Sequence, residues 1–250
     1  MLNPEQHYEK VTHLEFASLS EHRVKRIIKL ANTLKAENLL DIGCGDGVVT
    51  IAVAQALRAT KIYGVDISPK LVEKALKNGV LASVLNLSAA PLPFNDNSFD
   101  FVICTDVLEH LFDPDFVIKE IYRVLKPTGF AIISTPNLAA WHERFSLLFG
   151  FQPESTAASM YYGFIGKLFA KNPEGAGEHI RVPTFRALKQ LLKIHNFNVV
   201  KVMGAWGKDY PKTLPVPFRV VYRGINAACL LRPSLAPCMI FLVKKKITEL

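Results

Sequence analysis

The chain has 250 residues, of which half are hydrophobic and 21% are charged. This composition excludes a disordered chain and leaves room for one large core, or two domains at most. The formal net charge is +8, yet residues 1–150 carry 15 basic and 17 acidic side chains, whereas residues 151–250 carry 15 basic and 5 acidic ones. The basic last part is compatible with an anionic partner, namely an acidic substrate, a membrane surface or nucleic acid, or with a solvated surface that has no partner.

The N-terminus has no basic region followed by an apolar stretch, so no signal peptide is predicted. The four cysteines are Cys44, Cys104, Cys229 and Cys238. Because none forms a C-x-x-C pair, we expect free thiols in a reducing cytosol and a cytoplasmic protein. Residues 225–243 are largely apolar but contain Arg232 and two prolines, which disfavour a membrane-spanning helix. A short buried strand at 238–243 fits this segment better.

Helical periodicity covers residues 4–36, and short apolar runs then alternate with helical segments. The strands predicted in the first part lie at 39–42, 61–66, 80–85, 99–104 and 130–134. The helices predicted between them lie at 48–57, 68–77 and 115–125, the last one stopped by Pro127 and Gly129. This alternation predicts an α/β fold with a mostly parallel sheet and helices on both faces. The carboxyl ends of its strands would share one edge, where such sheets bind ligands.

The regular alternation ends after Pro136. The segments predicted beyond it are an apolar helix at 138–149, an aromatic stretch at 160–164, an amphipathic helix at 184–195, a strand at 198–202, a loop at 206–217 and the last strand at 238–243. We interpret residues 1–250 as a single domain. Its predicted additions are a helical cap at 1–36 and insertions at 138–183 and 205–235 over the ligand edge.

The string from Asp41 to Gly47, D-I-G-C-G-D-G, joins the first strand to the first helix of this alternation. Glycines let the backbone turn sharply and let a ligand approach it, and the helix that follows offers free N–H groups and a positive dipole end. A nicotinamide oxidoreductase would show G-x-G-x-x-G, whereas the spacing here is G-x-G-x-G. A carboxylate at Asp41 would repel a pyrophosphate but would suit a ligand with an ammonium and a sulfonium group. A tight turn without a ligand is the structural alternative.

This string resembles the S-adenosylmethionine (SAM) motif of the class I, Rossmann-like methyltransferases. The resemblance implies that Asp66 binds the ribose hydroxyls, for which a carboxylate is suited. It also places Asn86 where family members often have an Asp that holds the adenine amino group, and the segment 105–111 beside the methionine end of SAM. The implied cofactor-binding residues are Asp41, Gly43, Cys44, Gly45, Gly47, Asp66, Ile67, Asn86, Leu87 and Thr105. The family fold implies a Rossmann-like, doubly wound seven-stranded sheet with an antiparallel last strand.

Methyl transfer from SAM, which leaves S-adenosylhomocysteine, needs a general base only when the acceptor loses a proton with a high pKa. His110 is the first candidate for a catalytic base, and His142 and His179 are the others; a structural role is the alternative for each. Asp106, Glu109 and His110 form a D-x-x-E-H cluster. It is similar to the E-x-x-E-H segment of ubiquinone-biosynthesis O-methyltransferases, which can hold a divalent metal. We assign no metal site from this pattern and leave its use of a metal open.

The apolar stretch at 138–169 either caps the sheet or lines a pocket for a hydrophobic acceptor. Together with the basic last part, it is also compatible with peripheral contact with an anionic membrane, and nucleic acid is the least favoured partner. The sequence therefore predicts an enzyme, a SAM-dependent methyltransferase that acts on a small-molecule or lipid-like acceptor. The alternative is a catalytically inactive protein of the same fold that binds SAM or a partner. The acceptor, the atom methylated and the oligomeric state are not specified.

Overall fold

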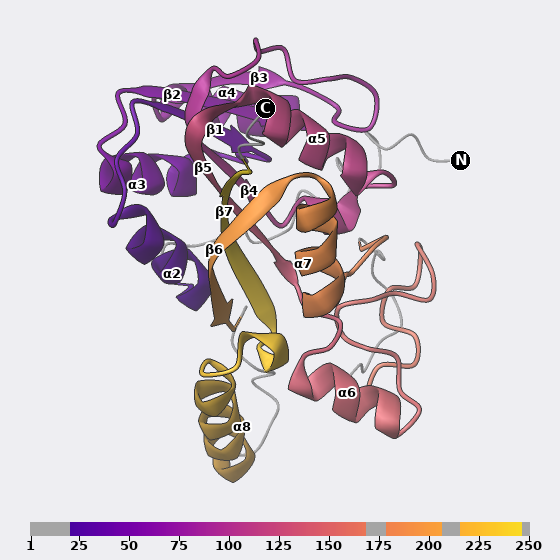
Figure 1. Cartoon of the computed structure of the whole chain (residues 1–250). Coiled ribbons are helices and arrows are strands. Elements are labelled where there is room, and N and C mark those ends of the chain that lie inside the picture. The colour runs from indigo at the N-terminus through magenta and orange to yellow at the C-terminus, as the bar shows by residue number, and fades with distance from the viewer. Residues whose placement is uncertain (1–20, 169–178, 207–215, 247–250) are drawn as a thin grey trace.

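The computed structural model describes residues 21–168, 179–206 and 216–246. The strands are β1 (Asn38–Ile42), β2 (Lys61–Asp66), β3 (Leu81–Val84), β4 (Phe99–Thr105), β5 (Leu125–Pro136), β6 (Phe197–Ala205) and β7 (Cys238–Lys245). Within the described residues they form one sheet in the order β3-β2-β1-β4-β5-β7-β6 (Figure 1). The pairs from β3 to β5 are parallel, and β7 runs antiparallel to both of its neighbours. The predicted seven-stranded fold class is therefore confirmed.

Helices cover both faces of the sheet (Figure 1). The α-helices are α2 (His22–Ala31), α3 (Val48–Leu57), α4 (Pro69–Lys77), α5 (Pro114–Val124), α6 (Trp141–Leu148), α7 (Phe185–Ile194) and α8 (Val216–Cys229). Successive strand residues point to opposite faces, so Leu39 packs in the core under α2 and α3, whereas Leu40 packs in the core under α5 and α7. A strand buried on both faces explains the continuous apolar runs of the sequence.

Strand β5 is longer than predicted. It begins at Leu125 and not at 130, because Leu125 pairs with Phe99 before a shift in the register. Pro127 and Gly129 lie inside the strand and do not separate it from α5. A Cβ at Gly129 would lie 2.8 Å from a methyl group of Leu125, so this glycine serves close packing at the irregularity.

Two helical predictions change in extent, and one helix was not predicted. Of the helical segment predicted at 4–36, residues 1–20 lie outside the described residues, and the remainder contains one helix, α2. Helix α6 begins at Trp141, after a turn held by the buried Asn137 side chain, which donates to the carbonyl oxygens of Ser234 and Ala236. Helix α8 occupies the proposed insertion at 205–235, of which residues 207–215 are not described. That these segments are insertions in a single domain stays a prediction.

The segment tested for a membrane span divides between the end of α8 and strand β7. In the described part of the chain, no helix combines the length and the apolar character that crossing a membrane requires. All four cysteines are described, and each is a free, buried thiol.

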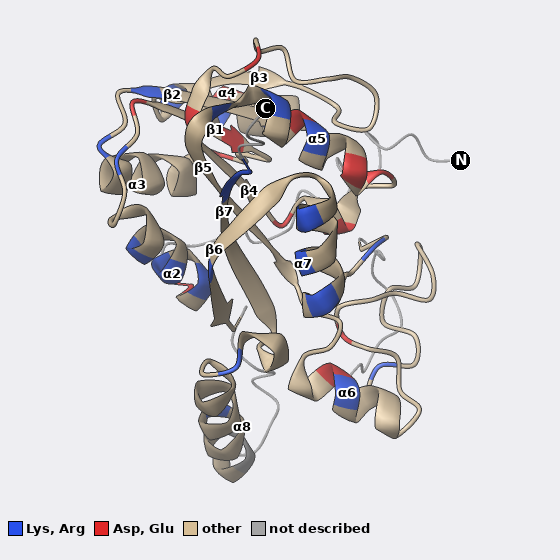
Figure 2. Cartoon of the chain, viewed as in Figure 1, with Lys and Arg blue, Asp and Glu red and all other residues tan. Residues whose placement is uncertain are grey.

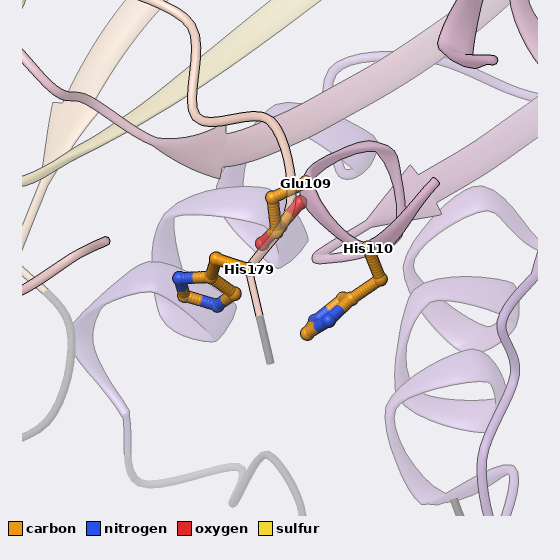
Figure 3. A group of neighbouring side chains, drawn as sticks. All are labelled: Glu109, His110 and His179. Atoms are coloured by element: carbon orange, nitrogen blue, oxygen red, sulfur yellow. The ribbon is translucent and has the colours of Figure 1, made fainter. Parts of the chain in front are cut away.

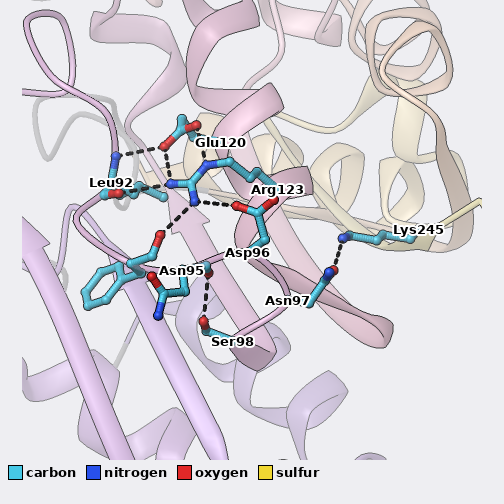
Figure 4. A network of polar contacts seen from close by, with 9 residues as sticks. Leu92, Asn95, Asp96, Asn97, Ser98, Glu120, Arg123 and Lys245 are labelled. Carbon is cyan, nitrogen blue, oxygen red and sulfur yellow. Dashed lines mark hydrogen bonds and ion pairs between the residues drawn. The ribbon is translucent and has the colours of Figure 1, made fainter.

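Arg123 on α5 organises the loop between β3 and β4 (Figure 4). Its guanidinium group donates to both carboxylate oxygens of Glu120 at 2.7 and 2.8 Å and to Asp96 at 2.9 Å. It also donates to the carbonyl oxygens of Leu92 and Phe94. The Arg123 bonds hold the pKa of Glu120 below its ordinary value. The loop is thus fixed to α5 by a planar, charge-assisted network.

We expect Arg123→Met to lower the free energy of unfolding by about 2 kcal/mol, because it leaves the mostly buried Glu120 carboxylate without its cation. Urea denaturation measures this change. Arg123→Lys, which keeps the charge but not the planar fork, should lose less. Equal stability of Arg123→Met and the wild type would show that the network does not stabilise the fold.

Candidate active site

The glycine loop between β1 and α3 has three residues in the left-handed region. These are Gly43, Gly45 and Gly47, with φ of 77°, 56° and 81°. A Cβ at Gly43 would lie 2.4 Å from a Val107 methyl group, and one at Gly47 would lie 2.9 Å from Val80. A Cβ at Gly45 would meet nothing within 4 Å. Gly43 and Gly47 are therefore required by packing as well as by backbone conformation, whereas Gly45 faces open space that a ligand can enter.

Hydrogen bonds and packing contacts bring the loops after β1, β2, β3 and β4 together. The Gly43 N–H donates to the carbonyl oxygen of Val65 at 2.8 Å, and the Gly45 N–H donates to Asp66 Oδ2 at 2.9 Å. The Leu85 N–H donates to the Asp66 carbonyl oxygen, which holds the end of β3 beside the end of β2. Val107, after β4, reaches Gly43 as described above. The carboxyl edge predicted from the alternation of strands and helices is thus a contiguous group of loops.

Asp66 holds the loop through both carboxylate oxygens. Oδ2 accepts from Gly45 and Oδ1 accepts from the Ser68 N–H at 2.9 Å. Burial raises the pKa of Asp66, and these two N–H groups act in the opposite direction. A carboxylate oxygen can accept more than one hydrogen bond, so a diol at this edge would still find acceptors.

Asp41 lies inside the protein and not at the open edge. Its Oδ2 accepts from the Thr50 hydroxyl at 2.5 Å, which ties β1 to α3. Its Oδ1 is buried and has no partner within the described residues. The pKa of Asp41 is raised to about 7, because burial and the charge of Asp66 raise it by more than the Thr50 bond lowers it. In the described structure, the Asp41 side chain therefore links β1 to α3.

The remaining predicted cofactor residues lie around the same edge. Cys44 is buried against Gly64, its thiol donates to the carbonyl oxygen of Gly45 at 3.8 Å, and burial raises the pKa of this thiol. Ile67 and Leu87 are half-buried. The Asn86 side-chain oxygen accepts from the Ser88 N–H at 3.0 Å. Thr105 ends β4 and is half-buried.

Glu109, His110 and His179 converge beside this edge (Figure 3). Each offers an atom able to bind a metal, and these atoms lie within 4.8 Å of one another. The rings of His110 and His179 meet edge to face with centroids 4.9 Å apart. The segment with His179 is held there because the N–H groups of Ile180 and Arg181 both donate to the Glu109 carbonyl oxygen. Two of the three predicted catalytic histidines are therefore brought together.

Glu109 is the least satisfied polar group of this cluster. Its side chain is fully buried, and neither carboxylate oxygen has a well-formed hydrogen bond within the described residues. Burial raises the pKa of Glu109, and the neighbouring Thr135 hydroxyl and Arg23 guanidinium offset this only in part. A buried carboxyl group with so few hydrogen bonds is costly, which marks Glu109 as a candidate for contact with a ligand.

His142, the third predicted catalytic histidine, lies on α6 beside Glu143, with 3.4 Å between Nε2 and Oε1. The buried Glu143 carboxylate also accepts from the Ser155 N–H, and the Ser155 carbonyl oxygen lies 2.7 Å from Nδ1 of His179. His142 is thus connected to His179 only indirectly, through contacts with Glu143 and Ser155, and it is not part of the cluster. Glu143 and Ser155 carried no motif that would have marked them in the sequence.

Asp106 is separated from the D-x-x-E-H set. It has a positive φ of 55° directly after β4, and its carboxylate forms an ion pair with Arg23 of α2. Among the described residues, the group that could hold a metal is therefore Glu109, His110 and His179. His179, which is remote in sequence, takes the place that the sequence pattern assigned to Asp106. Arg23, which also pairs with Glu21 at 3.2 Å, was not singled out by any sequence pattern.

Comparisons with known proteins identify the class. The methyltransferase domain family matches residues 40–133. A demethylmenaquinone methyltransferase of Staphylococcus carnosus (strain TM300) is 31% identical over 215 residues, covering 80% of this chain and 84% of the relative. One from Staphylococcus aureus (strain MRSA252) is 32% identical over 206 residues, covering 76% and 80%.

Solved structures show the same fold. A SAM-dependent methyltransferase from Thermotoga maritima superposes with a TM-score of 0.59 at 19% identity and covers 90% of each chain. One from Archaeoglobus fulgidus gives a TM-score of 0.55 at 18% identity, covering 89% of this chain and 91% of the other. The chain belongs to the class I SAM-dependent methyltransferases, with relatives named demethylmenaquinone methyltransferases, and it is an enzyme of that class.

The raised pKa of Asp41 predicts a pH dependence of stability. Between the ordinary pKa of 3.8 and about 7, the folded chain keeps a proton that the unfolded chain releases, so this group's contribution to stability falls as the pH rises. Asp41→Asn removes that dependence while its amide oxygen can still accept from Thr50. Relative to the wild type, the variant should gain about 2 kcal/mol between about pH 5 and pH 7.5 in urea denaturation. A difference that stays constant with pH would contradict the assignment.

Proposed function

We propose that the glycine loop and Asp66 bind SAM and that the enzyme methylates a hydrophobic, quinone-like acceptor beside Glu109 and His179. The proposed cofactor site is supported by the open space at Gly45. This space lies next to the Asp66 carboxylate, which can accept further hydrogen bonds. When bound, SAM supplies a methyl group activated by its sulfonium. The residues proposed to bind it are Asp41, Gly43, Cys44, Gly45, Gly47, Asp66, Ile67, Asn86, Leu87 and Thr105.

The acceptor class rests on the relatives and on the residues near the cluster. The curated relatives are named demethylmenaquinone methyltransferases, and a quinone ring with an apolar chain fits the apolar, aromatic stretch that follows β5. We propose that the segments at 138–183 and 205–235 lie over this acceptor within a single domain. The free thiols support a cytoplasmic location.

His179 is the histidine best suited to remove a proton from the acceptor. The Ser155 carbonyl can only accept a hydrogen bond, so Nδ1 of His179 carries the hydrogen and Nε2 keeps a lone pair. Burial lowers the pKa of His179 from its ordinary value, which keeps the ring neutral near pH 7. His110 packs edge to face against this ring and orients it. Glu109 would stabilise the cation that forms when His179 takes up a proton.

Titration calorimetry with S-adenosylhomocysteine tests the cofactor site. We expect micromolar binding by the wild type and a loss of about 10- to 100-fold in Asp66→Ala, because hydrogen bonds to a charged group are removed. Asp46→Ala changes a carboxylate of the same loop that only caps the next turn through Val48, and it should bind within about twofold of the wild type. Absence of binding by the folded wild type would mean that the motif is kept for structure and would favour the inactive alternative.

The role of His179 predicts a change in the pH profile as well as in rate. His179→Asn should lower kcat by about 100-fold or more and remove the acidic limb of the profile, which lies below the ordinary histidine pKa. Binding of S-adenosylhomocysteine should be unchanged. His195→Gln is the matched control, since that ring is bonded to Asp115 on α5 at 2.6 Å. An unchanged profile in His179→Asn would exclude it as the base.

The same assay distinguishes a proton-transfer cluster from a metal site. The proposed base requires activity that survives chelation of divalent cations. Activity that is lost with a chelator and restored by one cation would instead make Glu109, His110 and His179 ligands and would overturn the assignment of His179 as the base.

A further inference from the structure

Helices α6 and α8 lie at the same end of the molecule, and the start of α6 contacts α8 (Figure 1). The Trp141 indole N–H, at the start of α6, donates to Asn226 Oδ1 at 2.8 Å, and Asn226 on α8 is buried. The Trp141 ring also meets the ring of Tyr222 edge to face, with centroids 5.2 Å apart. These contacts join two segments that are far apart in the sequence.

Exposed apolar side chains lie on both helices and just after each of them. We call this group the apolar tip and define it by Leu148, Phe149, Val220, Val221, Ile225 and Leu231. Leu148 is 77% exposed, Val220 62% and Leu231 86%. Single exposed apolar residues are ordinary, but a group of them at one end of a protein marks an interaction surface.

The charges on and after α8 are positive, whereas beside α6 the exposed Glu154 offsets one positive charge. Residues 216–246 contain no Asp or Glu, and Arg223 and Arg232 are exposed there. On α6, Arg144 is exposed whereas Glu143 is buried beneath the helix. Figure 2 shows blue but no red on α8. An apolar surface with a cationic border complements a layer that is apolar inside and anionic outside.

We propose that the apolar tip docks on the surface of an anionic lipid membrane. Helix α8 has 14 residues and α6 has 8, so neither is long enough to cross the hydrocarbon layer. A second copy of the chain is a poorer occupant, because a symmetric contact would bring two cationic borders together. Anionic headgroups neutralise the cationic border, and the acyl chains beneath them surround the apolar side chains.

The apolar tip lies at the edge of the sheet that carries the site. Helix α6 follows the carboxyl end of β5 at Pro136, and α8 precedes Cys238, which pairs with Pro136 in the register of β5 and β7. A lipid-like acceptor would therefore reach the site from the side of the membrane. Only this last step rests on the proposed function; the docking itself does not.

Vesicle flotation with the full chain tests the docking. We compare vesicles of phosphatidylcholine alone with vesicles that contain phosphatidylglycerol. The wild type should partition at least about tenfold more strongly to the anionic vesicles, and about 0.5 M salt should reduce this difference. Leu148→Glu combined with Val220→Glu should lower partitioning by about tenfold or more, because two carboxylates would enter the interface.

Ile194→Glu is the matched control. Ile194 is 72% exposed at the end of α7, and it precedes Phe197, which pairs with Lys245 at the end of β7 remote from Cys238. Its partitioning should equal that of the wild type. Absence of anionic preference, or an equal loss in this control, would overturn the proposal. A dimer without vesicles that dissociates in the double variant would assign the apolar tip to a second copy instead.

The docking and the proposed function can fail separately. Binding of S-adenosylhomocysteine and circular dichroism establish that the double variant is folded with an intact cofactor site. If docking is correct, the wild type should methylate a long-chain acceptor faster in anionic vesicles than in phosphatidylcholine vesicles, and the double variant should lose this difference. Retention of the difference in the double variant would contradict docking, whereas failure of all acceptors with retained vesicle binding would contradict the acceptor class only.

Discussion

The glycine loop depends on one carboxylate. Asp66 accepts from the Gly45 N–H with one oxygen and from the Ser68 N–H with the other, and so joins the ends of β1 and β2 to the start of α4. Three glycines in the left-handed region leave this loop without the hydrogen bonds of a helix or strand, so its shape is set by Asp66 and the Val65 carbonyl. These contacts fix the position of the loop in which the opening at Gly45, and with it the proposed cofactor site, lies.

Buried acidic groups gather where the strands end, and their environments differ. Asp66 keeps several N–H partners, Asp41 has one hydroxyl partner, and Glu109 has no well-formed bond. Burial raises the pKa of each, so the protein forgoes stability near neutral pH at this edge. Buried polar groups without a full set of hydrogen bonds are expected at functional sites. The presence of such groups here agrees with a site that binds a charged ligand or transfers protons.

The irregular segments after β5 are tied to the edge by a few polar residues. Asn137 holds the chain at the start of α6 to the segment before β7, and Glu143 holds the turn at Ser155, which in turn bonds His179. The Glu109 carbonyl fixes the next residues, Ile180 and Arg181. Through these contacts the cluster beside the sheet and the start of α6 belong to one connected structure.

The sequence by itself determined the alternation of strands and helices up to β4, the positions of α3 and β2, and the glycine loop, because hydrophobic periodicity and the needs of a tight turn are local properties. It did not determine the start of β5, because pairing of Leu125 with Phe99 overrides the turn signals of Pro127 and Gly129. Nor did it reveal α8 within 205–235. Only the tertiary structure decided that His179 joins Glu109 and His110 while Asp106 turns to Arg23, since these contacts depend on which loops the sheet places side by side.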